Sequence, residues 1–363
     1  MKKILTVCVC FWLLVLLVGC TSTANKKNDY DLFVGMVTDS GRIDDKSFNQ
    51  GTWEGIKRAN KEFGRIRSKY LIPRGTTEVD KNKEITNLHD AGAHMIVTPG
   101  FKFESSIYIL QDKYPQTKFV LLDSVPRSAA DFNSVKIADN TVAIVFAEHE
   151  AGFMAGVAAA LQLRDGDAAF IGGMEIPNVQ RYNWGYQQGI KYANKQFGTQ
   201  LSVKPHNIVY QGTFTDVAAG QQIAAQMYAS GVKVIFAAAG AVGNGTINEA
   251  IARAKNGEQV WVIGCDVDQY AHGIYDRKAN KSIMLTSAMK GIGEASFSMV
   301  RDLKQGKFKG GRVIVFNAQN DGVGLPRENP NLDANVQKQL ELVYSKLKNG
   351  EIKVQDNGQG LIK

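Results

Sequence analysis

Short apolar runs alternate with longer amphipathic stretches along almost the whole chain, and this alternation constrains the fold more than any other feature. It is the pattern of parallel β-strands joined by helices. Nine apolar runs are predicted strands: Leu32–Thr38, His94–Thr98, Lys118–Leu122, Ala168–Gly172, Ser202–Tyr210, Val232–Ala238, Val260–Cys265, Ser282–Thr286 and Val313–Asn317. Seven stretches with apolar residues at three- and four-residue intervals are predicted helices: Gly51–Phe63, Ala147–Leu163, Val179–Phe197, Ala218–Ser230, Gly243–Lys255, Gly293–Gln305 and Asn331–Leu347.

The number of strands and the length of the chain together predict two lobes. Nine strands are more than one small sheet holds, and 363 residues exceed what a single core of roughly 250 to 300 residues accommodates. We therefore expect an α/β fold with two doubly wound lobes, a hinge and a cleft between the lobes. The first lobe is predicted to comprise residues 31–140 and about 267–315, and the second residues 141–266 and about 316–363.

The first twenty residues have the features of an export signal. Two lysines precede an apolar run from Ile4 to Val18, as in a secretory signal peptide. This run is shorter than the roughly twenty residues that a membrane-spanning helix needs. It ends in Leu-Val-Gly-Cys at Cys20, which resembles the bacterial lipoprotein signal. The resemblance implies that residues 1–19 are removed, that Cys20 carries a lipid, and that residues 20–30 tether the protein to a cell membrane, facing the periplasm or the cell exterior.

The cysteines and the charge narrow the possible partners. Cys8 and Cys10 leave with the signal and Cys20 carries lipid, so Cys265 has no disulfide partner; it lies in an apolar run and is predicted to be a core residue. The net charge of +8 suits an anionic membrane surface. It is spread along the chain without a long basic run or a zinc-finger spacing, so we expect no nucleic-acid partner.

Polar or small residues follow several of the predicted strands. Because ligands of doubly wound sheets bind beyond the carboxyl ends of the strands, such residues are candidates for a binding site. Five positions have this placement: Asp39, Asp123, Gly240, Asp266 and Lys290. Each alone is equally typical of a helix cap or a solvated side chain. Their recurrence after five different strands predicts a cleft.

The segment from Gly35 to Gln50 reads Gly-Met-Val-Thr-Asp-Ser-Gly-Arg-Ile-Asp-Asp-Lys-Ser-Phe-Asn-Gln, and Trp53-Glu-Gly follows it. It resembles the signature of the basic membrane protein (Bmp) family. Members of this family are purine-nucleoside receptors that serve ABC importers. Further matches are Phe119-Val-Leu-Leu-Asp123, Ala151-Gly-Phe-Met-Ala-Gly-Val-Ala158, Gly172-Gly-Met-Glu175, Gly212-Thr-Phe214, Gly243-Asn-Gly245 and residues 261–270. The Asp-Asp-Lys-Ser-Phe-Asn-Gln block is the most specific of them, and the resemblance covers essentially the whole mature chain.

The family resemblance implies a fold similar to the type I periplasmic binding proteins, with a ligand clamped between the lobes. It implies a purine nucleoside such as guanosine, inosine or adenosine as ligand, an ABC permease in the membrane as partner, and a monomer. The residues that it implies as ligand contacts are Asp39, Phe48, Asn49, Asp123, Phe214, Gly240, Asp266 and Lys290. A receptor for a sugar or another small metabolite on the same fold, and a surface adhesin, remain alternatives.

Each implied contact has a chemical reason. Phe48 and Phe214 would stack on the two faces of the base. Asn49 offers both donors and an acceptor, and together with Asp39 and Asp123 it would read the polar rim of a purine. These phenylalanines could also be core residues, and the polar residues could be turn or cap residues.

On the sugar side, Asp266 would accept hydrogen bonds from the ribose hydroxyls, and Lys290 would donate to the sugar. Gly240 would make a ribose-side contact. The family usually has an extra glycine and a threonine where this chain has Ala241 and Val242, so a backbone contact at Gly240 would persist and a hydroxyl contact would not.

Motifs for catalysis and for cofactors are not found in the sequence. The turn from Gly240 to Gly245 reads Gly-x-x-Gly-x-Gly, which matches neither the dinucleotide nor the Walker phosphate-binding pattern, so no cofactor is expected. The five histidines form no zinc-type pair and no Gly-x-Ser-x-Gly motif is present. His149 lies between two glutamates, but adjacent helical residues point in different directions. We therefore expect no metal site and no enzymatic activity.

The best enzyme alternative is a nucleosidase that holds a metal with Asp39, Asp44 and Asp45. Asp44 and Asp45 fit better in the first turn of a helix, where carboxylates meet the positive end of the helix dipole.

Overall fold

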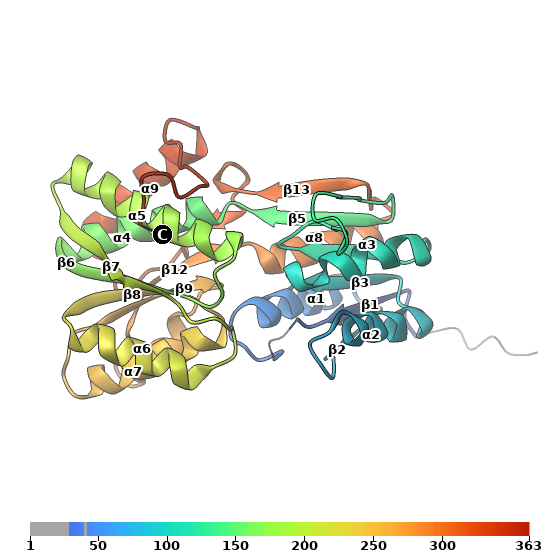
Figure 1. Ribbon diagram of the computed structural model, residues 1–363, viewed down its shortest axis with the longest axis horizontal. Helices are drawn as coiled ribbons and strands as arrows, with labels where there is room; N and C mark the ends of the chain where they lie inside the picture. The colour runs from blue at the N-terminus through green and yellow to red at the C-terminus, as the bar shows by residue number, and fades with distance from the viewer. Residues whose placement is uncertain (1–28, 40–41, 363) are drawn as a thin grey trace, which may run out of the picture.

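A computed structural model describes residues 29–39 and 42–362, which form two lobes (Figure 1). The sheet of the first lobe has six parallel strands in the order β13-β5-β4-β3-β1-β2. The strands are β1 (Leu32–Val37), β2 (Ile66–Leu71), β3 (Met95–Pro99), β4 (Lys118–Leu122), β5 (Thr141–Phe146) and β13 (Arg312–Phe316). The predicted signal peptide, Cys20 and most of the predicted tether lie outside the described residues.

The sheet of the second lobe also has six strands, in the order β14-β12-β9-β8-β6-β7. All its pairings are parallel except that of the short strand β14 with β12. Its strands are β6 (Asp165–Gly172), β7 (Gln200–Tyr210), β8 (Val232–Ala238), β9 (Trp261–Asp266), β12 (Met284–Lys290) and β14 (Val323–Gly324). A separate antiparallel ribbon pairs β10 (Ile274–Asp276) with β11 (Lys281–Ser282).

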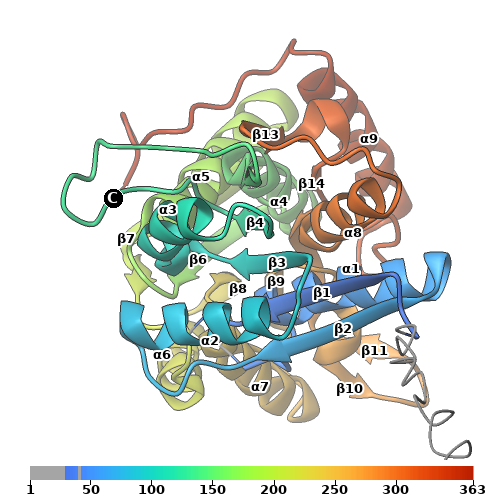
Figure 2. The same cartoon turned by 90° about the vertical axis from the view of Figure 1, so that its right-hand side faces the viewer.

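Helices cover both faces of each sheet, so the predicted α/β fold with two doubly wound lobes is confirmed. The helices are α1 (Phe48–Phe63), α2 (Glu78–Asp90), α3 (Glu104–Lys113), α4 (Glu148–Leu163), α5 (Pro177–Phe197), α6 (Val217–Ala229), α7 (Ala241–Lys255), α8 (Ile292–Lys304) and α9 (Ala334–Lys348). Short 3₁₀ turns are η1 (Phe101–Phe103), η2 (Tyr270–Gly273) and η3 (Ala318–Asn320). In Figure 2, α2 and α3 lie on one side of the first sheet and α1 and α8 on the other.

The alternation of side chains along β1 shows why both faces are covered. Val34 and Met36 pack into the core beneath α1 and α8, whereas Phe33 and Val37 pack beneath α2 and α3. All four side chains are completely buried. A strand buried on both faces reads as a continuous apolar run, as this one does. In the second lobe, the core under α4 and α5 is separate from the core under α6 and α7 in the same way.

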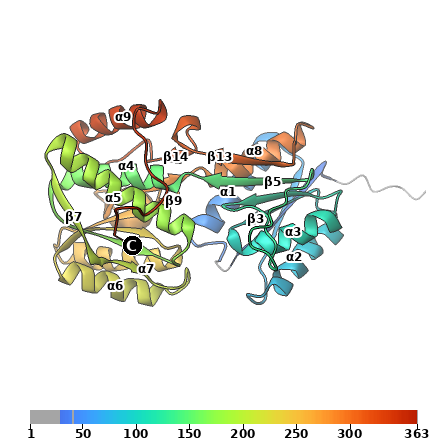
Figure 3. The same cartoon turned by 45° about the horizontal axis from the view of Figure 1, so that its top comes forward.

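Within the described residues the chain passes between the lobes three times, from β5 to α4, from β12 to α8, and from β13 to β14. These crossovers are hydrogen-bonded side by side: Ala147 N donates to Phe316 O at 2.9 Å, and Gly291 N donates to Gly322 O at 2.8 Å. Figure 3 shows β5, β13 and β14 along one edge of the molecule. Three short connections at one edge form a hinge between the lobes.

The lobe boundaries differ from the prediction at two places. Residues 141–146 were assigned to the second lobe, but they form β5, which pairs with β4 in the first sheet. Residues 267–315 were assigned to the first lobe, but they include β12, which pairs with β9 in the second sheet. The cause is strand pairing between distant parts of the chain, which local patterns do not encode. None of the described helices is long and apolar enough to cross a membrane.

Candidate functional site

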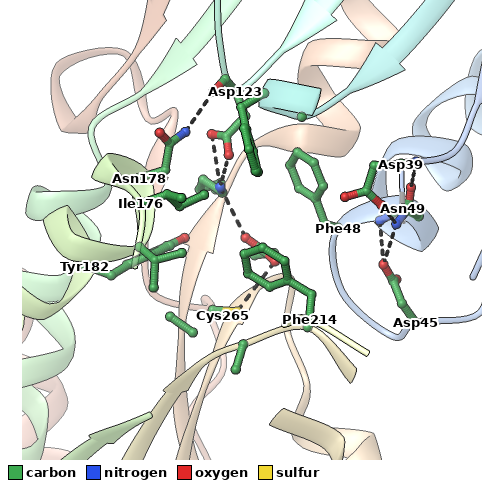
Figure 4. A pocket seen from close by; sticks show the side chains of 18 of the residues that line it. Asp39, Asp45, Phe48, Asn49, Asp123, Ile176, Asn178, Tyr182, Phe214 and Cys265 are labelled. Atoms are coloured by element: carbon green, nitrogen blue, oxygen red, sulfur yellow. Dashed lines mark hydrogen bonds and ion pairs between the residues drawn. The ribbon is translucent and has the colours of Figure 1, made fainter. Parts of the chain in front are cut away.

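A pocket lies between the lobes, and all eight residues predicted as ligand contacts line it (Figure 4). The space between its lining atoms is about 680 Å³, part of which is open to solvent. Several other lining residues were not predicted as nucleoside contacts: Asp45, Gly100, Phe101, Ile176, Asn178, Val179, Tyr182, Ala238, Ala239 and Ala241. Cys265 is buried, as predicted, but it also lines the pocket.

Strand ends bring these residues together. Asp39 and Asp123 follow β1 and β4 in the first lobe, while Gly240 follows β8 in the second. Asp266 and Lys290 are the last residues of β9 and β12. The carboxyl ends of both sheets face the cleft, which is where doubly wound sheets bind ligands.

The two phenylalanines that the sequence predicted to stack on a base come from opposite lobes. Phe48 is the first residue of α1, and Phe214 lies in the loop between β7 and α6. Figure 4 shows both rings directed into the pocket. The ammonium group of Lys290 lies 5.0 Å from the centre of the Phe48 ring. Phe214 packs directly against Gly173, where a side chain would collide with the ring.

The beginning of α1 is held by Asp45, whose carboxylate accepts hydrogen bonds from the backbone N–H groups of Ser47, Asn49 and Gln50 at 2.9, 2.8 and 3.1 Å. Asp45 precedes the helix instead of lying in its first turn as the sequence predicted, but its carboxylate still meets the positive end of the helix dipole. Burial raises the pKa of Asp45, and the hydrogen bonds with Asn49 oppose that rise.

The amide of Asn49 is already engaged. Its Nδ2 donates to Asp39 Oδ1 at 2.8 Å and to Asp45 Oδ2 at 2.9 Å, while its Oδ1 accepts from Asp39 N at 3.2 Å. Because an amide nitrogen has two hydrogens, both donors are used. Asn49 therefore orients Asp39 in this structure, rather than offering free donors to a base as the sequence suggested.

A charged cluster joins the lobes around Lys290, whose side chain is buried. Its Nζ donates to Asp123 Oδ2 at 3.0 Å and to Oδ1 at 3.1 Å, and lies 3.4 Å from Asp266 Oδ1. Asp266 also accepts a hydrogen bond from the Ser47 hydroxyl. Burial alone would raise the pKa of Asp123, but the charge of Lys290 holds it below its ordinary value. Burial alone would lower the pKa of Lys290, and the two aspartates raise it instead.

The two aspartates that flank Lys290 share an unusual backbone conformation. Asp123 has φ of 68° and Asp266 has φ of 67°, in the left-handed region that few residues other than glycine adopt. Aspartate tolerates this region better than most residues. Each lobe thus turns a carboxylate sharply into the cleft at the end of its strand, and such local strain is concentrated at functional sites.

Three further hydrogen bonds cross the cleft. Asn178 Nδ2 donates to Asp123 O at 2.7 Å, Gln269 Nε2 to Lys46 O at 2.9 Å, and Asn244 Nδ2 to Asp45 O at 3.1 Å. The lobes are therefore in contact in this structure. Asn178 follows β6 by a short loop, so the strand-end rule applied to that strand could have found it.

The nucleosidase alternative needs three aspartates to converge, and Asp44 does not join the other two. Its side chain is exposed and pairs with Arg42 at 2.9 Å, whereas Asp45 binds the beginning of α1. Among residues 29–39 and 42–362, no group of three or more histidine, cysteine, aspartate or glutamate side chains is placed to hold a metal ion.

Comparison with known proteins identifies the family. The model of the Bmp family, described as ABC transporter substrate-binding protein PnrA-like, matches residues 33–358. The chain belongs to the Bmp family. The ABC transporter nucleoside-binding protein BmpA of Lactococcus lactis is 32% identical over 323 residues, covering 86% of this chain and 88% of the relative. The CD4+ T-cell-stimulating antigen of Listeria innocua is 31% identical over 340 residues, covering 92% and 90%. The resemblance found in the sequence is thus confirmed.

Solved structures agree on the fold of this Bmp-family protein. A solute-binding protein of an ABC transporter system from Aeropyrum pernix K1 has a TM-score of 0.75 and 22% sequence identity, covering 90% of this chain and 95% of the other. At this identity the likeness shows the fold alone. The chain is an ABC-transporter substrate-binding protein with a fold like that of the type I periplasmic binding proteins.

Proposed function

We propose that this Bmp-family protein binds purine nucleosides in the pocket between its lobes and delivers them, as a monomer, to an ABC permease. The lipid that the sequence implies on Cys20 would hold it at the membrane. The observation that carries the proposal is the pair of aromatic rings, Phe48 and Phe214, that opposite lobes contribute to one pocket. A nucleic-acid base stacks on an aromatic ring whichever base it is, because every base has a flat face.

The polar groups of the pocket support a ligand rich in hydrogen-bond donors. Asp39, Asp123 and Asp266 are carboxylates, which only accept hydrogen bonds when ionised. A purine offers N–H groups and a ribose offers hydroxyls to them. The pocket also has more acidic than basic side chains, so a neutral nucleoside fits its charge better than a nucleotide, whose phosphate would be repelled.

Closure of the lobes is the step that we expect to couple binding to transport. The first lobe supplies Phe48, Asp39 and Asp123, and the second supplies Phe214 and Asp266. The full set of contacts therefore exists only when the cleft is closed. A ligand therefore stabilises the closed form by its differential affinity for it, and the permease would recognise that form. The similarity to the BmpA protein of Lactococcus lactis, whose name states nucleoside binding, supports the same ligand class.

Calorimetric titration tests the ligand class. The purified protein is unfolded and refolded to remove any co-purified ligand, then titrated with guanosine, inosine, adenosine, cytidine and ribose. We expect micromolar or tighter binding of the purine nucleosides and none of ribose. Binding of ribose or another sugar without nucleosides would favour the sugar-receptor alternative. If the folded protein bound none of the five compounds, the result would contradict the proposed function.

Gly173→Ala should weaken nucleoside binding without unfolding the protein. A Cβ at this position would lie 2.9 Å from Thr213 O and still closer to the Phe214 ring, which must move. Overpacking of this kind costs about 1 to 3 kcal/mol. A loss of that size in binding free energy raises Kd by about 5- to 150-fold.

The matched control is Gly243→Ala. Its Cβ meets Ala237 Cβ at 3.6 Å, an ordinary van der Waals contact, and its Kd should be unchanged. Equal affinities in the two variants would show that the position of the Phe214 ring does not matter for the ligand.

A further inference from the structure

Glu148 is the first residue of α4, directly after the crossover from β5, and its side chain is completely buried. One oxygen, Oε2, accepts a hydrogen bond from Arg181 Nε at 2.7 Å. The other, Oε1, receives none from any donor among the described residues. It lies 3.9 Å from Lys290 Nζ, beyond hydrogen-bond distance, and the Glu148 carboxyl group is within hydrogen-bonding reach of Asp123. Two carboxyl groups this close form a hydrogen bond only when one of them holds a proton.

The balance of charge around Glu148 also requires a proton. Three acidic side chains from different elements meet there: Asp123 after β4, Asp266 at the end of β9, and Glu148 on α4. The cations that pair with them are Lys290 and Arg181. Three carboxylates against two cations leave one uncompensated negative charge in a buried site, which is costly. A single proton on one carboxyl group removes it.

Other titratable groups near Glu148 do not supply this compensation: they are His149, Glu150, Tyr182, Cys265 and Asp356. Burial lowers the pKa of His149 to about 4, so it is neutral at pH 7. Burial raises the pKa of Tyr182 and Cys265, which keeps both neutral. Glu150 accepts a backbone N–H from η3 at 2.6 Å, and Asp356 acts on Arg181 from the C-terminal segment. Both of these acids add negative charge.

We propose that Glu148 is a positioning residue of the pocket: it holds a proton that it shares with Asp123, and this proton keeps Asp123 and Lys290 in their ligand-facing arrangement. The inference deepens the proposed function, on which it rests, because Asp123 and Lys290 line the proposed nucleoside site. Glu148 itself does not line the pocket. It acts through the two residues that do.

The pH window follows from the surroundings of Glu148. Burial, and next the charge of Asp123, raise its pKa from 4.5 to about 8. The folded protein therefore holds this proton up to about pH 8, whereas the unfolded chain loses it near pH 4.5. By linkage, the contribution of Glu148 to folding stability decreases as pH rises through this window. Above pH 8 the ionised group repels Asp123 and attracts Lys290, so ligand affinity should fall.

Glu148→Gln tests the proposal, because the amide is neutral like the protonated acid and can still donate to Asp123 and accept from Arg181. The full chain in detergent is titrated with guanosine from pH 6 to pH 9. For the wild type we expect a constant Kd up to about pH 8 and then a rise of at most about tenfold per pH unit, the limit for one proton. For Glu148→Gln we expect the wild-type Kd at pH 7 and no rise.

Glu150→Gln is the matched control, since it makes the same change two residues away on α4, and it should keep the wild-type pH dependence. Thermal unfolding without ligand gives an independent measurement: the melting midpoint of the wild type should fall more steeply between pH 6 and pH 9 than that of Glu148→Gln. If no nucleoside binds, the proposed function fails and the melting curves still decide this inference. A pH dependence of Glu148→Gln identical to the wild type, or its loss of guanosine binding at pH 7 with normal melting, would overturn it.

Discussion

Lys290→Met should lower the free energy of unfolding by about 3 to 5 kcal/mol at pH 7, the usual cost of removing one partner from a buried ion pair. The substitution leaves the carboxylates of Asp123 and Asp266 buried without the cation that lies 3.0 and 3.4 Å from them. Methionine has about the same length and fills the space, so lost charge rather than a cavity causes the effect. Urea denaturation followed by circular dichroism measures it.

The pH dependence of this loss of unfolding free energy shows whether the missing charge or altered packing causes it. Lys290 holds the pKa of Asp123 below its ordinary value of 3.8, against the effect of burial. A group with a lowered folded pKa contributes stability above its unfolded pKa, and this contribution disappears as the pH falls. The gap between wild type and Lys290→Met should therefore narrow from pH 7 toward pH 4. A gap that stays constant would indicate packing as the cause.

Lys57→Met is the control for a general effect of removing a lysine. Lys57 pairs with Glu54 at 2.7 Å on the surface, and both side chains are about half exposed. Surface pairs contribute about 0 to 1 kcal/mol, so this variant should unfold almost like the wild type. If Lys290→Met unfolded at the same urea concentration as Lys57→Met, the buried cluster would not depend on its cation.

The elements that could be predicted from the sequence are those with strong apolar periodicity. Each of the nine predicted strands coincides with a strand, and each of the seven predicted helices with a helix. The missed β2 (Ile66–Leu71) lies at the edge of its sheet, and three consecutive polar residues, Arg67 to Lys69, interrupt its apolar residues. The missed α2 (Glu78–Asp90) is mostly polar and leaves little apolar pattern to detect.

β5 shows a different limit. Its apolar residues run almost directly into α4, with Ala147 alone between them. The predicted helix began at Ala147, and residues 141–146 were not predicted as a strand. Its membership of the first lobe depends on pairing with β4 and β13. Such long-range pairing determines the lobe boundaries, and local sequence patterns do not predict the pairing.

The candidate site was predictable where a strand end or a family motif marked the residue. Asp123 and Asp266 satisfy both conditions, and they lie in the pocket with their carboxylates on Lys290. Glu148 satisfies neither condition. Its neighbours His149 and Glu150 are polar, so the segment was interpreted as the exposed face of a helix. Its burial comes from the packing of α4 against α5 and the crossover strands, which only the folded chain shows.

Replacing the two rings one at a time and together is expected to give the largest effect on binding. Base stacking contributes about 1 to 3 kcal/mol per ring, so Phe48→Ala and Phe214→Ala should each raise Kd for guanosine by about 5- to 150-fold. Both residues border an open pocket, so the folded state should persist, which the melting midpoints will check. Phe132→Ala removes an exposed ring outside the pocket and should leave Kd unchanged.

The double variant tests whether the two rings act together. Phe48 belongs to the first lobe and Phe214 to the second, so each ring completes a sandwich only when the lobes close on the base. Loss of one ring reduces the benefit of closure and therefore weakens the contact of the other ring. We expect the double variant to lose less binding free energy than the sum of the single losses, as contacting residues in one network do. Strictly additive losses would mean that the rings act independently of closure, and unchanged affinity in either single variant would remove its ring from the nucleoside site.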